Sequence, residues 1–79
     1  MKIQVLDPQQ TLFEGAVSEA TLPGCDGELT ILDDHESVFV VLKRGLIRLT
    51  PLVKTTGAGG IAEIKPIKIH RGLARMKRN

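Results

Sequence analysis

Large aromatic side chains are almost missing from this chain. It has no tryptophan and no tyrosine, and Phe13 and Phe39 are its only aromatic residues. The core therefore has to be built from isoleucine, valine and leucine, and base stacking on aromatic rings is disfavoured as a binding mode. Eight glycines and four prolines in 79 residues favour many short strands and turns over a helical bundle.

Cysteine and long apolar runs are also scarce. Cys25 is the single cysteine, so no disulfide can form within the chain, which fits a reducing compartment. No apolar run approaches the roughly 20 residues that a membrane-spanning helix needs, and residues 1–20 lack the layout of a signal peptide. We therefore expect a cytoplasmic protein.

Sequence signals for catalysis and for cofactors are absent as well. The chain has no glycine-rich loop followed by lysine and a hydroxyl residue, and Gly57–Gly60 precedes no helical pattern. Asp33, Asp34, His35 and Glu36 are consecutive, so on an extended chain they point to alternating sides and do not converge on one metal ion. Cys25 has acidic neighbours and no basic one. The sequence predicts no catalytic residue, no cofactor site and no metal site.

Charge is divided unequally along the chain. Residues 1–36 contain eight acidic residues and one basic residue, whereas residues 37–79 contain ten basic residues and one acidic residue. This division predicts either an acidic and a basic surface that orient a charged partner, or two halves that attract each other across the fold. The basic half also permits a second class of function, a stand-alone β-barrel module that binds nucleic acid.

Alternating apolar and polar residues predict short strands joined by turns. Residues 38–42 are apolar on both faces, as in a strand buried on both sides. The basic segment at residues 70–79 is interpreted as a tail that is partly solvated or docks elsewhere. The fold expected is all-β, a small β-sandwich or flattened barrel of about 7–10 short strands, forming one domain over residues 1–79. The strands are expected at residues 1–7, 12–15, 16–22, 28–32, 38–42, 46–50, 61–64 and 67–69.

The most specific local feature is a turn followed by a strand. Pro23 fixes φ, and Gly24 and Gly27 permit positive φ, so residues 23–27 reverse the chain. In the strand that follows, Leu29 and Ile31 face the core and Glu28 faces water. Residues 33–37 then form either a loop or the start of a short helix.

An ordered series of short motifs covers about residues 1–50 without a gap. It comprises a strand over Met1–Asp7, then Leu12-Phe13-Glu14-Gly15, Leu22-Pro23-Gly24, Gly27-Glu28-Leu29-Thr30-Ile31-Leu32, His35, the apolar run Val38–Leu42, and Gly45-Leu46-Ile47-Arg48-Leu49. In this order and spacing the series resembles the ε subunit of F-type ATP synthases, called δ in mitochondria, over its N-terminal β-sandwich.

The resemblance implies a non-catalytic subunit of the central-stalk rotor. Such a subunit packs on the γ subunit and against the membrane c-ring, and it couples proton or sodium flow to ATP synthesis. It binds no cofactor and no nucleic acid, and it is peripheral to the cytoplasmic face of a bacterial inner or plasma membrane without inserting into lipid. By resemblance Glu28 lies near the c-ring loops, and His35, Val38 and Phe39 lie near γ.

Three departures from the family pattern matter. The family loop usually reads Pro-Gly-His-Ala-Pro, whereas here Asp33-Asp34 precede His35 and Glu36-Ser37 follow it. After residue 50 two registers fit. The favoured register has the glycine pair at 59–60, a strand at 61–64 and the last strand at 67–69. The other has an enlarged loop at 51–66, the family glycine at Gly72 and a strand at Leu73–Met76. The family's C-terminal pair of helices, which inhibits the motor and can bind ATP in relatives, has no counterpart, so we expect neither property.

Overall fold

The computed structural model describes residues 1–33, 36–51 and 64–77. Every regular element in these ranges is a β-strand, and the strands pair antiparallel. The predicted all-β fold is therefore confirmed. The strands are β1 (Lys2–Leu6), β2 (Thr11–Gly24), β3 (Gly27–Leu32), β4 (Val38–Leu42), β5 (Gly45–Pro51), β6 (Ile67–Ile69) and β7 (Gly72–Lys77).

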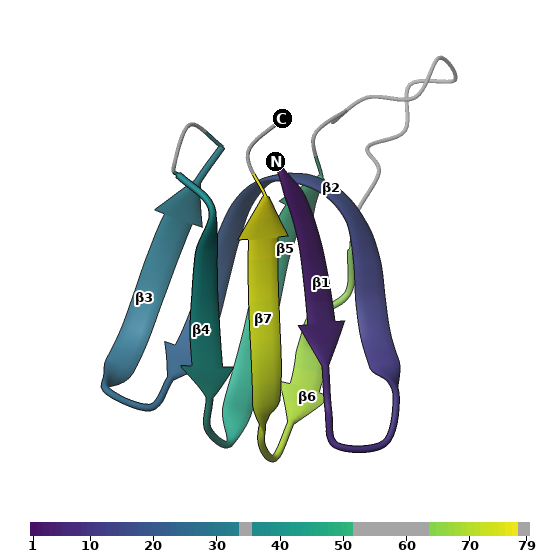
Figure 1. Ribbon diagram of the computed structural model, residues 1–79, viewed down its shortest axis with the longest axis vertical. Coiled ribbons are helices and arrows are strands. Elements are labelled where there is room, and N and C mark those ends of the chain that lie inside the picture. The colour runs from purple at the N-terminus through teal and green to yellow at the C-terminus, as the bar shows by residue number, and fades with distance from the viewer. Residues whose placement is uncertain (34–35, 52–63, 78–79) are drawn as a thin grey trace.

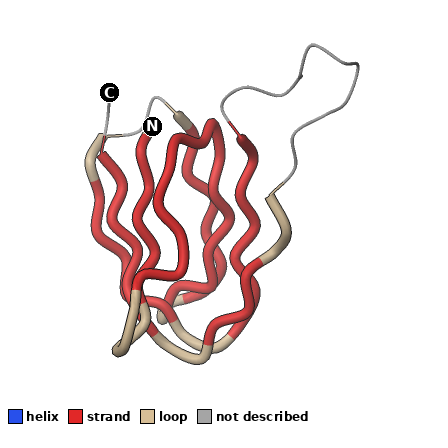
Figure 2. The backbone as a smooth tube through the Cα atoms, turned by 90° about the vertical axis from the view of Figure 1, so that its right-hand side faces the viewer, coloured by secondary structure: helices blue, strands red, loops and turns tan. Residues whose placement is uncertain are grey.

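The strands form two layers that face each other across an aliphatic core (Figure 1). Strands β1, β7 and β4 lie side by side in one layer, and β3, β2, β5 and β6 follow one another in the second. The side view in Figure 2 shows both layers running the length of the molecule. Inward-facing side chains alternate with outward-facing ones along most strands, as a two-layer sandwich requires.

One long strand belongs to both layers. The first part of β2 pairs with β1, placing Glu14 opposite Gln4, and the later part pairs with β3 and β5. Its buried residues change phase between Val17 and Ala20, because the pairing of β2 with β5 shifts register between Val17 and Glu19. A bulge of this kind adds one residue and bends the strand, so a single β2 replaces the two strands predicted at residues 12–15 and 16–22.

The core is aliphatic, as the shortage of aromatic residues predicts. It draws on both layers and contains no buried polar or charged side chain among the described residues. Its members are Met1, Ile3, Val5, Val17, Ala20, Leu22, Ile31, Leu42, Ile47, Leu49, Ile69, Ala74 and Met76.

Two predictions from the sequence are wrong. Residues 70–77 are not a tail: β7 lies between β1 and β4, because Ala74 and Met76 alternate with polar residues and fill the core. The favoured register had its last strand at residues 67–69, whereas the alternative register, with a strand at Leu73–Met76, matches β7. The strand predicted at residues 61–64 falls mostly outside the described residues, and Ile64 is in no strand.

The second wrong prediction concerns β4. Its pattern suggested burial on both faces, but Phe39 is 58% exposed and Val41 is 54% exposed. The inward side of β4 packs against the core through Val38, Val40 and Leu42, so β4 is buried on one side only.

None of the described residues belongs to a helix that is long and apolar enough to span a membrane.

Candidate partner-binding surfaces

The outer side of the first layer, which we call the β7 face, carries three cations and an apolar end. Strand β7 lies at its centre, with Leu73 opposite both Leu6 of β1 and Val41 of β4. Two residues further along, Arg75 lies opposite Gln4 and Phe39, and at the far end Lys77 lies opposite Lys2. The β7 face consists of Lys2, Gln4, Leu6, Phe39, Val41, Leu73, Arg75 and Lys77.

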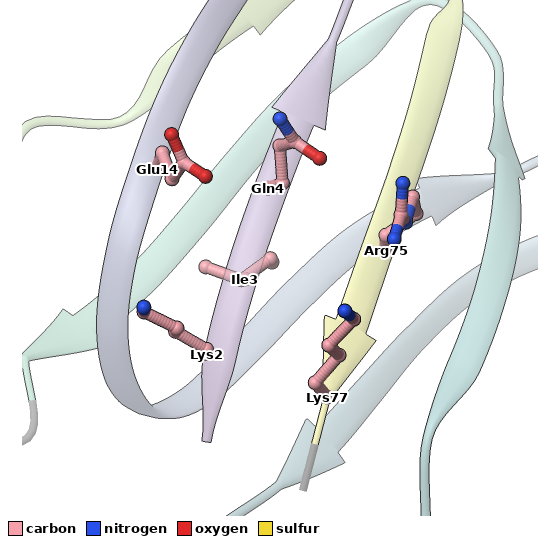
Figure 3. A pocket seen from close by; sticks show the side chains of 6 residues that line it. All are labelled: Lys2, Ile3, Gln4, Glu14, Arg75 and Lys77. Carbon is pink, nitrogen blue, oxygen red and sulfur yellow. The ribbon is translucent and has the colours of Figure 1, made fainter. Parts of the chain in front are cut away.

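Shallow depressions cover the β7 face from end to end. One of about 340 Å³ lies at the apolar end and includes Leu6, Val41 and Leu73. One of about 260 Å³ lies at the basic end, where the side chains of Lys2, Arg75 and Lys77 surround it together with Glu14 of β2 (Figure 3). A third, of about 400 Å³, includes Phe39 and Arg75. The described residues of the β7 face therefore form a series of open, shallow depressions.

The three cations of the β7 face are not neutralised by the rest of the described chain. Met1 and Asp33 form the single ion pair found in residues 1–33, 36–51 and 64–77, and Lys2, Arg75 and Lys77 make none there. The β7 face is thus the basic surface that the divided charge predicted. Within the same residues no ion pair joins the acidic half of the chain to the basic half.

The outer side of the second layer, which we call the β5 face, is balanced in charge. Thr21 lies opposite Thr30 and Arg48, and the hydroxyl oxygens of the two threonines are 3.1 Å apart. Two acidic and two basic side chains are spread over this face, so it is not the acidic surface that the sequence also suggested. The β5 face consists of Glu19, Thr21, Pro23, Glu28, Thr30, Leu32, Leu46, Arg48, Thr50 and Lys68.

The predicted turn is a tight hairpin at one end of the sandwich. Gly24 pairs with Gly27 across Cys25 and Asp26. Gly27 has a φ of +128°, a conformation that favours glycine, whereas Gly24 is needed for space, because a Cβ there would lie 2.8 Å from Leu29 Cδ2. The positive φ expected at both glycines is therefore found at Gly27 alone.

The hairpin is also tied to β4. The Cys25 amide donates to the Val41 carbonyl over 3.0 Å, and the Lys43 amide donates to the Pro23 carbonyl over 2.8 Å. These two bonds fix the position of the hairpin that carries Glu28 relative to the strand that carries Phe39.

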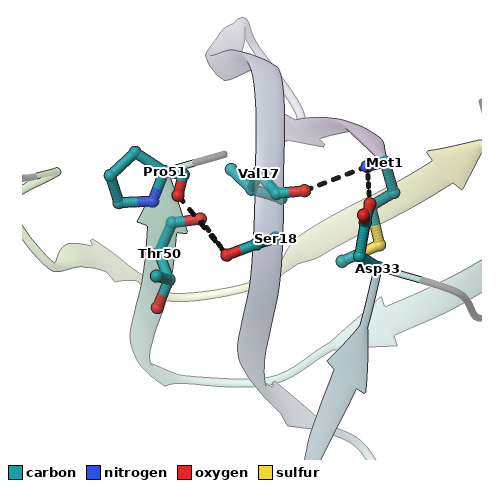
Figure 4. Close-up of polar contacts among 6 residues, drawn as sticks. All are labelled: Met1, Val17, Ser18, Asp33, Thr50 and Pro51. Carbon is teal, nitrogen blue, oxygen red and sulfur yellow. Dashed lines mark hydrogen bonds and ion pairs between the residues drawn. The ribbon is translucent and has the colours of Figure 1, made fainter. Parts of the chain in front are cut away.

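A second set of polar contacts joins the layers at the opposite end (Figure 4). The buried α-amino group of Met1 donates to the Val17 carbonyl over 3.0 Å and forms an ion pair with the Asp33 carboxylate. The Ser18 hydroxyl lies 3.4 Å from the carbonyl oxygens of both Thr50 and Pro51. Asp33, predicted to lie in a charged loop, thus has a structural contact.

The structure places the four predicted interface residues differently. Glu28 is exposed on the β5 face, and Phe39 is exposed on the β7 face. Val38 is half-buried and packs against the core. His35 lies outside the described residues. Glu28 and Phe39 therefore point away from opposite layers, so one flat partner does not contact both.

Sequence reasoning missed most of the β7 face. Lys2 and Gln4 were assigned only to a strand over residues 1–7, and residues 72–77 were not assigned to a strand in the favoured register. The alternation of Leu73, Arg75 and Lys77 with Ala74 and Met76 was the available signal. It is a strand pattern with a basic outer side.

Metal ligands do not cluster in the part of the chain that the structure describes. No group of three or more histidine, cysteine, aspartate and glutamate side chains lies close enough to hold an ion there. The candidate sites are therefore outer surfaces of the sandwich.

These features define the class of protein as a small antiparallel β-sandwich with an aliphatic core. Residues 1–70 match the family described as ATP synthase, Delta/Epsilon chain, beta-sandwich domain. The chain belongs to this family, which confirms the resemblance read from its motifs.

Individual relatives agree with this assignment. The chain is 34% identical over 70 residues to the chloroplastic ATP synthase epsilon chain of Phaeodactylum tricornutum, covering 81% of this chain and 50% of the relative. It is 32% identical over 82 residues to the ATP synthase epsilon chain of Rhodobacter capsulatus, covering 95% and 62%. The chain thus spans about half the length of the curated relatives it matches. Because chloroplast and bacterial relatives both appear, they do not confirm a bacterial origin.

Proposed function

We propose that the chain is a non-catalytic rotor subunit of an F-type ATP synthase, which packs on the γ subunit and against the c-ring. The observation that carries the proposal is the family match over residues 1–70, together with relatives named as ATP synthase epsilon chains. In this role the chain is a rigid spacer that couples proton or sodium flow to ATP synthesis. It binds the membrane peripherally, through the complex, on the cytoplasmic face or its equivalent.

Each outer face is assigned to a different partner, the β5 face to the c-ring and the β7 face to the γ subunit. Glu28 stands exposed beside a tight hairpin, where a carboxylate is well placed to accept a charge-assisted hydrogen bond from a c-ring loop. Phe39 is the exposed aromatic residue of the β7 face. We assign this face to the γ subunit, together with His35 and the edge of Val38.

Co-purification tests this proposal. The tagged chain is expressed together with the γ subunit of the same organism, and the washed complex is analysed by gel and mass spectrometry. We expect a stoichiometric complex with γ and assembly with the c-ring when the full rotor is expressed. Failure to bind γ or a c-ring assembly would refute the proposal.

The same preparation tests the competing interpretation, a nucleic-acid module that uses the basic half of the chain. A binder of that kind loses affinity steeply as salt rises, because each neutralised phosphate releases a counterion. We expect no tight RNA or DNA binding. A salt-sensitive nucleic-acid complex formed in preference to the γ complex would favour the alternative.

A further inference from the structure

We propose that the β7 face is the docking site for an acidic amphipathic helix of a partner protein. Apolar side chains of this helix cover Leu6, Leu73 and Val41, and its carboxylates lie over Lys2, Arg75 and Lys77. The inference rests on the proposed function in that γ is the first partner to test. It goes further by stating which face binds and what chemistry the bound segment carries.

The first argument is uncompensated like charge. Lys2 and Lys77 lie directly opposite each other on paired strands, and Arg75 is two residues from Lys77 on the same side. Like charges directly opposite each other destabilise a sheet. No described acidic side chain pairs with any of the three, and Glu14 is the one carboxylate that lines the same depression. Carboxylates supplied by a partner would remove this repulsion.

The second argument is apolar exposure on the same face. Phe39 and Val41 are both more than half exposed, and Val41 adjoins Leu73 and Leu6 in the largely apolar depression at one end. Contiguous exposed apolar area rimmed by polar groups is typical of a protein interface. On the β5 face, by contrast, the exposed leucines lie in different rows of the sheet and are separated by polar residues.

The third argument is the shape of the face. Both edges of β7 are paired, with β1 and with β4, so this face has no free strand edge at its centre to which another strand could add. A sheet face of this kind packs against a helix or a second sheet. From Leu73 to Lys77 the strand advances about 13 Å, which corresponds to about nine residues of a helix lying along it.

The charge pattern also selects among possible occupants. A second copy of the chain in a two-fold dimer presents the same patch to itself, which would set lysines and arginines of one copy against those of the other. An acidic protein segment instead satisfies the cations and the apolar end together.

The test compares matched variants of the two faces in complexes with γ. The charge-reversed variant of the β7 face is Arg75→Glu with Lys77→Glu, and its control on the β5 face is Arg48→Glu with Lys68→Glu. A second pair is Phe39→Thr with Val41→Thr, with Leu32→Thr and Leu46→Thr as control. Folding of every variant is checked by circular dichroism, and affinity for γ is measured by titration at two salt concentrations.

We expect both β7-face variants to weaken γ binding by about tenfold or more and both control variants to leave it within about twofold. Carbodiimide cross-linking, which joins an amine directly to a carboxylate, should couple Lys2 or Lys77 to γ. The variant Lys2→Arg with Lys77→Arg keeps the charge, so it should keep binding and lose the cross-link.

Each remaining outcome supports or overturns the docking inference, the proposed function or both. If γ binds but the β7-face variants bind it like the parent, the docking inference is wrong and the proposed function stands. If γ does not bind, the proposed function fails, and a synthetic amphipathic helical peptide rich in glutamate becomes the probe, with its lysine counterpart as control. Binding of the glutamate peptide through the β7 face supports the inference. No binding, self-association through this face, or preferential binding of anionic vesicles or RNA overturns it.

Discussion

The β7 face and the β5 face lie over the same core and differ in the charged and apolar side chains that they expose to solvent. The β5 face carries two acidic and two basic side chains, and the hydroxyls of Thr21 and Thr30 are within hydrogen-bonding distance of each other. The β7 face carries three basic side chains with Glu14 of the adjoining β2 as the one carboxylate beside them, and it exposes an aromatic ring beside a valine. One sheet surface is balanced by its own residues, while the other carries charge and apolar area that it does not balance.

The contrast between the two faces indicates which feature identifies a partner surface on a small β-sandwich. Alternation of apolar and polar residues describes both layers equally well, because it reports only which side chains enter the core. What separates the faces is the register between strands far apart in sequence, which places Lys2 against Lys77 and Leu6 against Leu73. Function on such a fold depends on these cross-strand neighbours more than on any single motif.

The largest expected effect concerns the core that both faces share. Ile3 lies beneath the β7 face and Ile47 beneath the β5 face, and both are fully buried. Replacing either with alanine should lower the free energy of unfolding by about 2–5 kcal/mol. Urea unfolding followed by circular dichroism measures it, since the chain has no tryptophan or tyrosine to report fluorescence. If one variant loses far less than the other, the two layers do not depend on a common core.

The next effect concerns the start of β7. A Cβ at Gly72 would lie 2.1 Å from the Leu6 carbonyl oxygen, so Gly72→Ala should force β7 away from β1 and cost about 1–3 kcal/mol. Gly15→Ala is the control, because its nearest neighbour is the Phe13 ring at 3.3 Å, a side chain that can move slightly. Equal loss of stability in the two variants would contradict close packing of β7 against β1.

A smaller effect is expected at the contact between the layers. Asp33→Asn removes the charge that faces the buried Met1 amino group. Asp33 is about half exposed, so water weakens the ion pair, and we expect a loss of about 1 kcal/mol in unfolding free energy. Asp26→Asn, in the exposed hairpin turn, is the matched control. A loss no larger than that of the control would mean that this ion pair does not hold the layers together.

The smallest effect on stability is expected on the β5 face. Glu28→Lys changes an exposed side chain, so unfolding free energy should change by less than about 0.5 kcal/mol, while ATP synthesis driven by ion flow through the reconstituted complex falls. Glu19→Lys is a control on the same face. An unfolded Glu28→Lys variant, or one with normal coupling, would remove Glu28 from the c-ring interface.

Much of the fold was predictable because it depends on local pattern. Leu29 and Ile31 alternate with Glu28 and Thr30, and the structure buries and exposes them accordingly. The glycines at 24 and 27 mark the hairpin at its observed position. The all-β class follows from many such short segments.

The remainder depends on contacts that no local pattern contains. No single alternation describes residues 16–22, because the bulge after Val17 reverses which side chains face inward within one strand. Residues 38–42 looked buried on both sides because β-branched residues fit an exposed strand as well as an internal one. The β7 face combines residues from positions 2 to 77, so it exists only once β7 pairs with β1 and β4.

The bulged strand β2 has a mechanical consequence. Because its 14 residues run through both layers, a force applied to one face reaches the other through covalent backbone. Sliding of the two layers past each other would require the hydrogen bonds between β1 and the first part of β2 to break, or β2 to bend further at its bulge. At the other end of β2, its pairing with β4 consists of Gly24 and Leu42 alone among the described residues. The Cys25–Val41 and Lys43–Pro23 hydrogen bonds add to this pair, so the layers are linked at both ends of β2 and we expect the domain to resist shear along it.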